Sequence, residues 1–340
     1  MASCFPCLSA RKKEVPRSAP ANPHTSSVPG AVARTFSFKE LAAVTRNFND
    51  ACRIVGREDG LYKGFLKSIN QVVAIKLQHV VDPSGSGEQD NREFLAYALT
   101  MSGLRHPNIV NFIGFCADGH HRILVHEYMP FGSLEDHLHG SSPGKAPLDW
   151  NTRMNIAAGV ARGLEYMHDK GVLYRCVRSS NILLGDGYHP KLSQYGLAEH
   201  DQLYADAAIT RGTWSTLAPE TGMTGKLFPG SSVYGFGVVL LEMITGRRAT
   251  DPPKDAIEDR HLVTWARTML KDRSQFRRMA DPALQGRYPP LDLQEALKVA
   301  SLCIHDDHTM RAPIGTVVTA LSRLAYDVDP PEPSNHAAPN

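Results

Sequence analysis

The chain has 340 residues, of which 42% are hydrophobic and 21% charged, and this composition is typical of a globular protein with a sizeable core. Its formal net charge of +2 argues against a nucleic-acid partner, because such a partner requires a dense basic face. No stretch approaches the roughly eighteen apolar residues of a membrane-spanning helix. The six cysteines are scattered and no secretory signal precedes them, so we expect reduced thiols and no bound metal.

Residues 1–35 are rich in Pro, Ser and Ala without periodicity, which predicts a disordered tail. Within this tail Cys4 and Cys7 precede the basic run Arg11-Lys12-Lys13. Acylation of both cysteines would supply two lipid chains, and the basic run would add attraction to anionic lipid. We therefore expect the protein at the cytoplasmic face of the plasma membrane. The alternative is a free tail on a protein of the cytoplasm.

The first part of the ordered chain alternates short helices with strands. Ser37 and Glu40 have the spacing of a capping box, which predicts a helix running to about Asn47. The following segments predict strands over 49–77, a polar loop over 80–91, a helix over 93–104 and two or three strands over 109–128. This is the composition of a small β-rich lobe.

The second part is helical. An apolar face at helical spacing predicts a long helix from about 150 to about 170. Further helices are expected at about 231–246, 260–271, 293–304 and 314–326. The sequence thus predicts an α+β fold of two lobes over 36–326, with the N-lobe at about 49–130 and the C-lobe at about 131–326. Residues 327–340 are expected to form a disordered C-terminal tail.

The strongest motif follows the helix that is predicted from about 150 to about 170. Tyr174-Arg175-Cys176, followed after four residues by Asn181, has the spacing of the protein-kinase catalytic loop H-R-D-x-x-x-x-N. Gln194-Tyr195-Gly196 stands where kinases carry D-F-G. Cys176 thus replaces the carboxylate that accepts the substrate proton, and Gln194 replaces the charged magnesium ligand. We expect no catalytic residue, no Mg²⁺ and no required cofactor.

A second motif places a lysine at the end of a strand. Val73-Ala74-Ile75-Lys76 has the form that kinases use to hold the α and β phosphates of ATP. The glutamate that pairs with this lysine is expected on the next helix, where Tyr97 stands instead. Glu93 lies one turn earlier on the same face and is the one nearby substitute.

The remaining nucleotide motifs are incomplete. Of the expected glycine-rich loop only Gly56 falls on a motif position, so an ordinary hairpin is favoured over a phosphate-binding loop. Glu127 and Met129 form the hinge that could still hold adenine, and with Lys76 and Asn181 they make up the residual nucleotide-binding set. ATP binding therefore stays open.

Other residues of the pattern are architectural. Glu220 closes the sequence Ala218-Pro219-Glu220, and Arg311 is placed to form a buried ion pair with it. Ser232 opens the central helix where kinases carry an aspartate that tethers the catalytic loop.

Taken together, these residues resemble the plant receptor-like cytoplasmic kinases, and in particular their membrane-associated, immune-signalling members. The resemblance covers 36–326 and is strongest in four segments: Glu127–Leu138, Leu148–Arg153, Ser179–Leu184 and Phe236–Gly246. It implies a two-lobed kinase fold, receptor-kinase partners and phosphorylation of the activation segment, where Thr210 and Thr213 are candidate acceptors. It also implies a tyrosine where this chain has His126.

Two hypotheses follow from the sequence. The first is a catalytically inactive pseudokinase that acts as scaffold, competitor or decoy among receptor kinases or other signalling kinases. The second is a weakly active Ser/Thr kinase that uses Lys76 and Asn181 with a carboxylate from elsewhere in the fold. The sequence does not identify the partner or the sign of the regulation.

Overall fold

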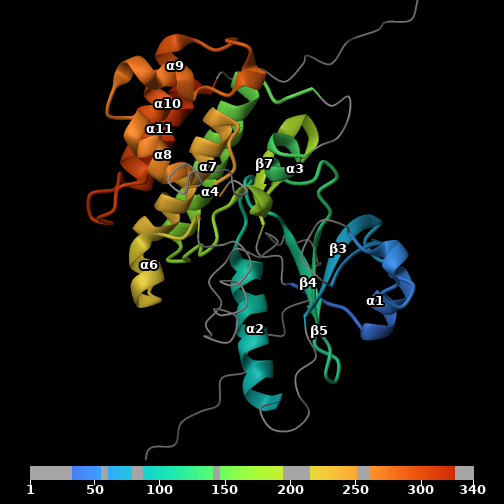
Figure 1. The fold of residues 1–340 in the computed structure, drawn as a ribbon. Helices are drawn as coiled ribbons and strands as arrows, with labels where there is room; N and C mark the ends of the chain where they lie inside the picture. The colour runs from blue at the N-terminus through green and yellow to red at the C-terminus, as the bar shows by residue number, and fades with distance from the viewer. Residues whose placement is uncertain are drawn as a thin grey trace, which may run out of the picture. The chain divides into compact units, whose positions relative to one another are not determined.

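The computed structural model describes residues 33–54, 60–78, 87–140, 146–193, 215–250 and 261–325. Strands dominate the part that precedes residue 130, and helices dominate the part that follows it (Figure 1). This is the mixed α+β architecture with a sheet-containing N-lobe and a helical C-lobe that the sequence predicted. The expected Gly56 loop position and the triplet Gln194-Tyr195-Gly196 lie outside the described residues.

The N-lobe is built on a five-stranded sheet with the order β1-β4-β5-β3-β2. β1 pairs parallel to β4, and the other neighbouring strands pair antiparallel. The strands are β1 (Arg34–Thr35), β2 (Leu61–Leu66), β3 (Gln71–Gln78), β4 (Phe112–Cys116) and β5 (Arg122–Glu127). Val73 and Ile75 of β3, which lies between β5 and β2, are fully buried, and this burial explains why its apolar run forms a strand rather than a loop.

The first helix begins where the sequence predicts and ends earlier. In α1 (Phe38–Val44) the Ser37 hydroxyl accepts a hydrogen bond from the Glu40 amide at 3.2 Å. The expected end near Asn47 is wrong because the Thr45 hydroxyl bonds back to the Leu41 carbonyl at 2.7 Å and the next three residues take positive φ angles. The Glu40 carboxylate accepts from the Ser68 hydroxyl at 2.8 Å, so it ties α1 to the turn after β2.

The expected disordered tail over 1–35 is too long by the residues of strand β1. Arg34 and Thr35 lie inside the range 1–35 but pair with Gly114 and Phe115 of β4. A Cβ atom at position 114 would overlap the Arg34 carbonyl oxygen, so only glycine lets β1 approach this closely. A strand of two residues has no periodicity that a sequence could show.

Helix α2 (Gly87–Gly103) carries Tyr97 and packs on the sheet. Phe94 meets Phe115 of β4 edge to face, with ring centroids 5.9 Å apart. The helix begins six residues before the expected position 93. The polar sequence before Phe94 lacks an apolar period, so the sequence alone indicates a loop there.

The C-lobe contains helices and one small sheet, in which β6 (Ile182–Leu184) pairs antiparallel with β7 (Pro190–Leu192). Helix α7 is buried along its whole length from Ser231 onward and forms the centre of the lobe. Helix α4 packs against α7 and α11. The helices are α3 (Leu134–Leu138), α4 (Trp150–Asp169), α6 (Pro219–Thr224), α7 (Pro229–Thr245), α8 (Leu262–Met269), α9 (Phe276–Met279), α10 (Pro290–Cys303) and α11 (Ile314–Leu324).

A buried ion pair joins α4 and α7 to the segment that follows α9. Arg153 of α4 is 2% exposed and donates to Asp281 Oδ2 at 2.7 Å, to the Met243 carbonyl of α7 at 2.7 Å and to the Leu148 carbonyl at 2.8 Å. Gly246 ends α7 with a φ of 67° and its Cα lies directly against the Asp281 carboxylate. In the described ranges no helix is long and apolar enough to cross a membrane.

Candidate functional site

The segment after α4 is an ordered loop that hydrogen bonds of Tyr174 and Asn181 hold in place. Tyr174 is fully buried, and its hydroxyl donates to the Ser193 carbonyl at 2.6 Å. Ser193 directly precedes Gln194 in the sequence. The side chain at position 174 therefore fixes the loop to the end of the β6–β7 hairpin, just before the triplet that replaces D-F-G.

Asn181 closes the same loop. Its side-chain amide donates to the Cys176 carbonyl at 2.9 Å, and its own carbonyl accepts from the Ser193 amide at 2.8 Å. Asn181 is only 5% exposed. The structure thus brings Tyr174, Cys176, Asn181 and Ser193 together, as the motif spacing requires, although the interaction of Tyr174 with Ser193 was not predicted.

In the sequence of this loop the thiol of Cys176 stands between two arginines, Arg175 and Arg178. Cys176 is half-buried and carries a thiol rather than a disulfide. The Nε atoms of Arg175 and Arg178 are buried and have no acceptor in the described part of the chain. A thiol has an ordinary pKa near 8.5, so it is mostly protonated at neutral pH. It therefore takes up a further proton far less readily than the ionised aspartate of a kinase does.

The described residues of this loop offer a magnesium ion no charged ligand at the motif positions Cys176 and Asn181. Mg²⁺ is held in phosphotransferases by carboxylate oxygens and substrate phosphates. Asn181 offers only the oxygen of a neutral amide, whose nitrogen donates to the Cys176 carbonyl. No cluster of three His, Cys, Asp or Glu side chains suited to a metal occurs among the residues that the structure describes.

Lys76 lies on β3 opposite Leu61 of β2 and Leu124 of β5. On α2, Tyr97 is half-buried and packs against the main hydrophobic core. A phenol has an ordinary pKa near 10, so it brings no negative charge to a lysine at neutral pH. Glu93 is half-buried and lies one turn before Tyr97, which displaces it by about 6 Å along the helix axis.

The hinge residues have contacts that the sequence did not reveal. The Glu127 carboxylate accepts from Lys191 Nζ at 2.7 Å and from the Asn111 amide at 2.6 Å. It therefore links the end of β5 to β7, and its side chain has a structural partner rather than a free carboxylate for a ligand. Met129 is 7% exposed and its methyl group lies near Gly185.

His126, the residue before Glu127, is buried. It is 1% exposed, pairs with Ala74 of β3, and its ring lies 5.3 Å from the Phe112 ring of β4. An imidazole thus occupies the interior of the sheet at the position where the family resemblance implies a tyrosine.

Helix α7 supports the loop at close range. A Cβ atom at Gly235 would lie 3.1 Å from the Val177 Cβ and 3.2 Å from the Thr216 carbonyl oxygen, so the helix backbone contacts the loop directly. Ser232, which stands at the position of the tethering aspartate, donates to the Pro229 carbonyl at 2.9 Å. Its hydroxyl oxygen also lies 2.7 Å from His168 Nε2 of α4. At this site the serine interacts with a histidine that sequence reasoning did not single out.

The burial of His168 gives the fold a pH dependence. Burial holds the pKa of His168 below its ordinary value of 6.5, although the neighbouring Asp169 opposes this effect. The unfolded chain then binds a proton more readily than the folded protein does. We expect the free energy of unfolding to decrease as the pH falls below 6.5, by at most about 1.4 kcal/mol per pH unit for this group.

Urea unfolding at about pH 7.5 and about pH 5.5 measures this dependence. The variant His168→Gln keeps an N–H donor toward Ser232 and removes the titrating group, so its unfolding free energy should depend less on pH. Part of the dependence should remain, because burial also lowers the pKa of His106. Equal pH dependence in both proteins would show that His168 does not contribute.

Glu220 and Arg311 form a bidentate ion pair between α6 and the segment before α11. The two carboxylate oxygens of Glu220 accept from Arg311 at 2.7 and 2.8 Å, and the Arg311 side chain is 1% exposed. Burial alone would raise the pKa of Glu220, but hydrogen bonds from Arg311 and Ser231 hold that pKa below its usual value. Thr210 and Thr213, the candidate phosphate acceptors, lie outside the described residues.

Comparison with known proteins identifies similar sequences. Residues 57–321 match the family described as protein tyrosine and serine/threonine kinase. In Arabidopsis thaliana, the serine/threonine-protein kinase PBL27 is 53% identical over 311 residues, which cover 89% of this chain and 59% of the relative. The probable serine/threonine-protein kinase PBL7 is 54% identical over 303 residues, covering 86% of this chain and 78% of the relative. The serine/threonine-protein kinase PBS1 is 51% identical over 301 residues, covering 86% of this chain and 64% of the relative.

Proposed function

The chain belongs to the protein tyrosine and serine/threonine kinase family, and we propose that it acts there as a pseudokinase, which binds other signalling proteins without transferring phosphate. The observation that carries this proposal is Cys176. It occupies the carboxylate position of a loop whose other contacts, from Tyr174 to Ser193 and from Asn181 to Cys176, are formed. The loop keeps these hydrogen bonds but lacks the carboxylate that accepts the substrate proton in kinases.

The metal and nucleotide positions support the same proposal. A neutral amide at Gln194 and a neutral amide at Asn181 give a divalent cation little to bind. Tyr97 brings no negative charge to the motif position of the glutamate that pairs with the lysine, and the Glu127 carboxylate forms an ion pair with Lys191. Charge neutralisation by metal ions is a main source of phosphoryl-transfer rate, so its loss removes most of the catalytic effect.

The alternative is a weak Ser/Thr kinase, which the named activities of the relatives favour. A phosphotransfer assay with ATP and Mg²⁺ or Mn²⁺ separates the two functions. We expect the intact protein to incorporate no more phosphate than its Lys76→Met variant. Activity that disappears in Lys76→Met would establish the weak kinase instead. A melting temperature raised by ATP alone would show nucleotide binding without transfer.

The partners that fit this function are receptor kinases or other signalling kinases. A folded kinase domain without phosphate transfer presents the docking surfaces of an active kinase, so it can act as scaffold, competitor or decoy. Thr210 and Thr213 would then be acceptors for a partner kinase rather than sites of self-phosphorylation.

The N-terminal segment supports a membrane location for this function. Two acyl chains on Cys4 and Cys7 together bind a membrane stably, whereas one chain binds only marginally. We expect the protein expressed in plant cells to sediment with membranes, and Cys4→Ser/Cys7→Ser to be released into the soluble fraction. The variant Cys52→Ser is the matched control and should stay with the membranes. Equal distribution of the wild type and the double variant would rule out acylation as the anchor.

A further inference from the structure

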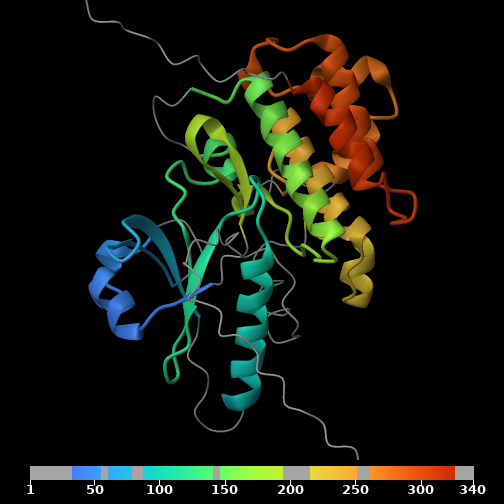
Figure 2. The same cartoon turned by 180° about the vertical axis from the view of Figure 1, so that it is seen from behind.

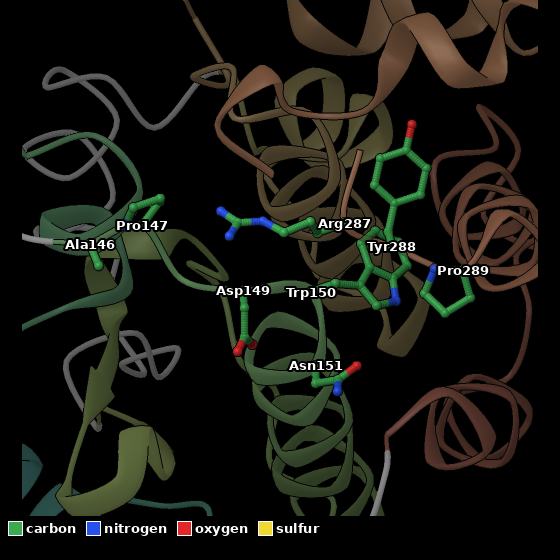
Figure 3. A pocket seen from close by; sticks show the side chains of 8 residues that line it. All are labelled: Ala146, Pro147, Asp149, Trp150, Asn151, Arg287, Tyr288 and Pro289. Carbon is green, nitrogen blue, oxygen red and sulfur yellow. The ribbon is translucent and has the colours of Figure 1, made fainter. Parts of the chain in front are cut away.

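A pocket of about 700 Å³ lies where α4 and α10 begin (Figure 3). The catalytic loop follows the other end of α4, whose 20 residues place the two sites about 30 Å apart. The lining residues are Ala146, Pro147, Asp149, Trp150, Asn151, Arg287, Tyr288 and Pro289. The pocket therefore belongs to no part of the site described above.

The walls of the pocket combine aromatic rings with one positive side chain, Arg287, and one negative side chain, Asp149. The Trp150 and Tyr288 rings lie 5.8 Å apart and are tilted by 46°. The Arg287 side chain is exposed, extends across the pocket in Figure 3, and forms no ion pair within the described ranges. Proline-rich segments in the extended polyproline conformation dock in aromatic grooves, and a neighbouring guanidinium favours acidic residues beside the prolines.

One wall also contains a donor without an acceptor. Trp150 is 2% exposed, and its indole Nε1 has no hydrogen-bond partner in the described part of the chain. Buried donors are nearly always satisfied in folded proteins. A polyproline segment leaves its backbone carbonyls unpaired, but this nitrogen is itself buried, so such a carbonyl reaches it only where the wall opens.

The segment that directly follows α11 has the complementary chemistry. It reads Tyr326-Asp327-Val328-Asp329-Pro330-Pro331-Glu332-Pro333. Three acidic residues flank three prolines, and residues 326–340 contain no Lys or Arg. The charge of this segment is opposite to that of Arg287.

The end of α11 is within reach of the pocket. Gly315, at the start of α11, lies against Glu165, near the end of α4, and α11 runs back along α4 toward Trp150 (Figures 1 and 2). With a rise of about 1.5 Å per residue, Leu324 is then roughly level with position 156 of α4, about 9 Å along the axis from Trp150. An extended chain spans up to about 17 Å between Ala325 and Pro330, which covers this distance.

We propose that residues 327–333 dock in this pocket of their own chain, with Pro330 and Pro331 against the Trp150 and Tyr288 rings and the acidic residues beside Arg287. The docked segment joins the starts of α4 and α10 to the end of α11. It also occupies the pocket against acidic, proline-containing segments of other proteins.

Competition in trans tests this docking. A fluorescent peptide of residues 326–336 is titrated into the full-length wild type and into the full-length variant Pro330→Ala/Pro331→Ala. Because a tethered segment acts at a local concentration of up to millimolar, the peptide should bind the wild type at least about tenfold more weakly than the variant. Arg287→Glu in the variant background should abolish binding, whereas Lys298→Glu, on the exposed side of α10, should leave it unchanged.

Three results would overturn the proposal. Equal peptide binding to wild type and variant would mean that the pocket accepts such segments only from another molecule. Absence of binding to both would mean that the pocket does not recognise this sequence. Binding to the variant that survives Arg287→Glu would mean that the peptide binds elsewhere.

Discussion

Arg311→Met is expected to lower the free energy of unfolding by about 3–5 kcal/mol, because it leaves the Glu220 carboxylate buried without its counter-charge. The loss extends beyond the ion pair itself. Arg311 also donates to the carbonyls of His305, Gly230 and Asp306, which would lose their partner. Since domains of this kind are stable by about 5–15 kcal/mol, the variant should be close to unfolding at 37 °C. Urea unfolding monitored by circular dichroism measures the difference.

Two companion variants separate charge from packing. In Arg311→Met/Glu220→Leu no carboxylate is left unpaired, so we expect part of the loss to be recovered. Lys298→Met removes an exposed partner of Glu295, whose pair spans 3.7 Å, and should change the unfolding free energy by less than about 0.5 kcal/mol. If Arg311→Met destabilised the protein as little as Lys298→Met, the pair would not hold α6 to the C-lobe.

The elements that the sequence predicted well are those with a strong local signal. The apolar stripe of α4, the apolar run of β3 and the Ser37 cap each depend on residues within a few positions of one another. β1 depends instead on Gly114, about eighty residues away, and α2 begins in a polar segment without an apolar period. Such elements are fixed by tertiary contacts, which sequence spacing does not contain.

The same distinction holds at the site. Motif spacing located Tyr174, Cys176 and Asn181 along the chain, but it did not give the direction of any side chain. It therefore missed the bond from Tyr174 to Ser193 and the ion pair of the Glu127 carboxylate with Lys191. The assignment of Glu127 and Met129 to a hinge for adenine stays a prediction. Motif spacing identified Ser232 only as the replacement of an aspartate. In the structure the Ser232 hydroxyl lies next to His168.

Restoring carboxylates is expected to create phosphate transfer only when they are restored together. Cys176→Asp supplies a proton acceptor, but without a metal ligand it should give no measurable gain over the wild type. Cys176→Asp/Gln194→Asp supplies both groups, and we expect its rate of phosphate incorporation to exceed that of the wild type by about 10²-fold or more. Adding Tyr97→Glu should increase the rate further, because a carboxylate then faces Lys76. Incorporation of labelled phosphate into a generic Ser/Thr substrate measures each rate.

The pattern of these rates tests the proposed cause of inactivity. Residues of one catalytic unit contribute non-additively, so the two single variants should together give far less than the double variant. The neutral pair Cys176→Asn/Gln194→Asn has nearly the same side-chain shapes as the aspartates and should give no gain, which separates charge from shape. Lys76→Met in the triple variant should remove the acquired activity, because the phosphates lose their lysine. If all combinations stayed inactive while each protein remained folded, the defect would lie in nucleotide binding rather than in the missing acids.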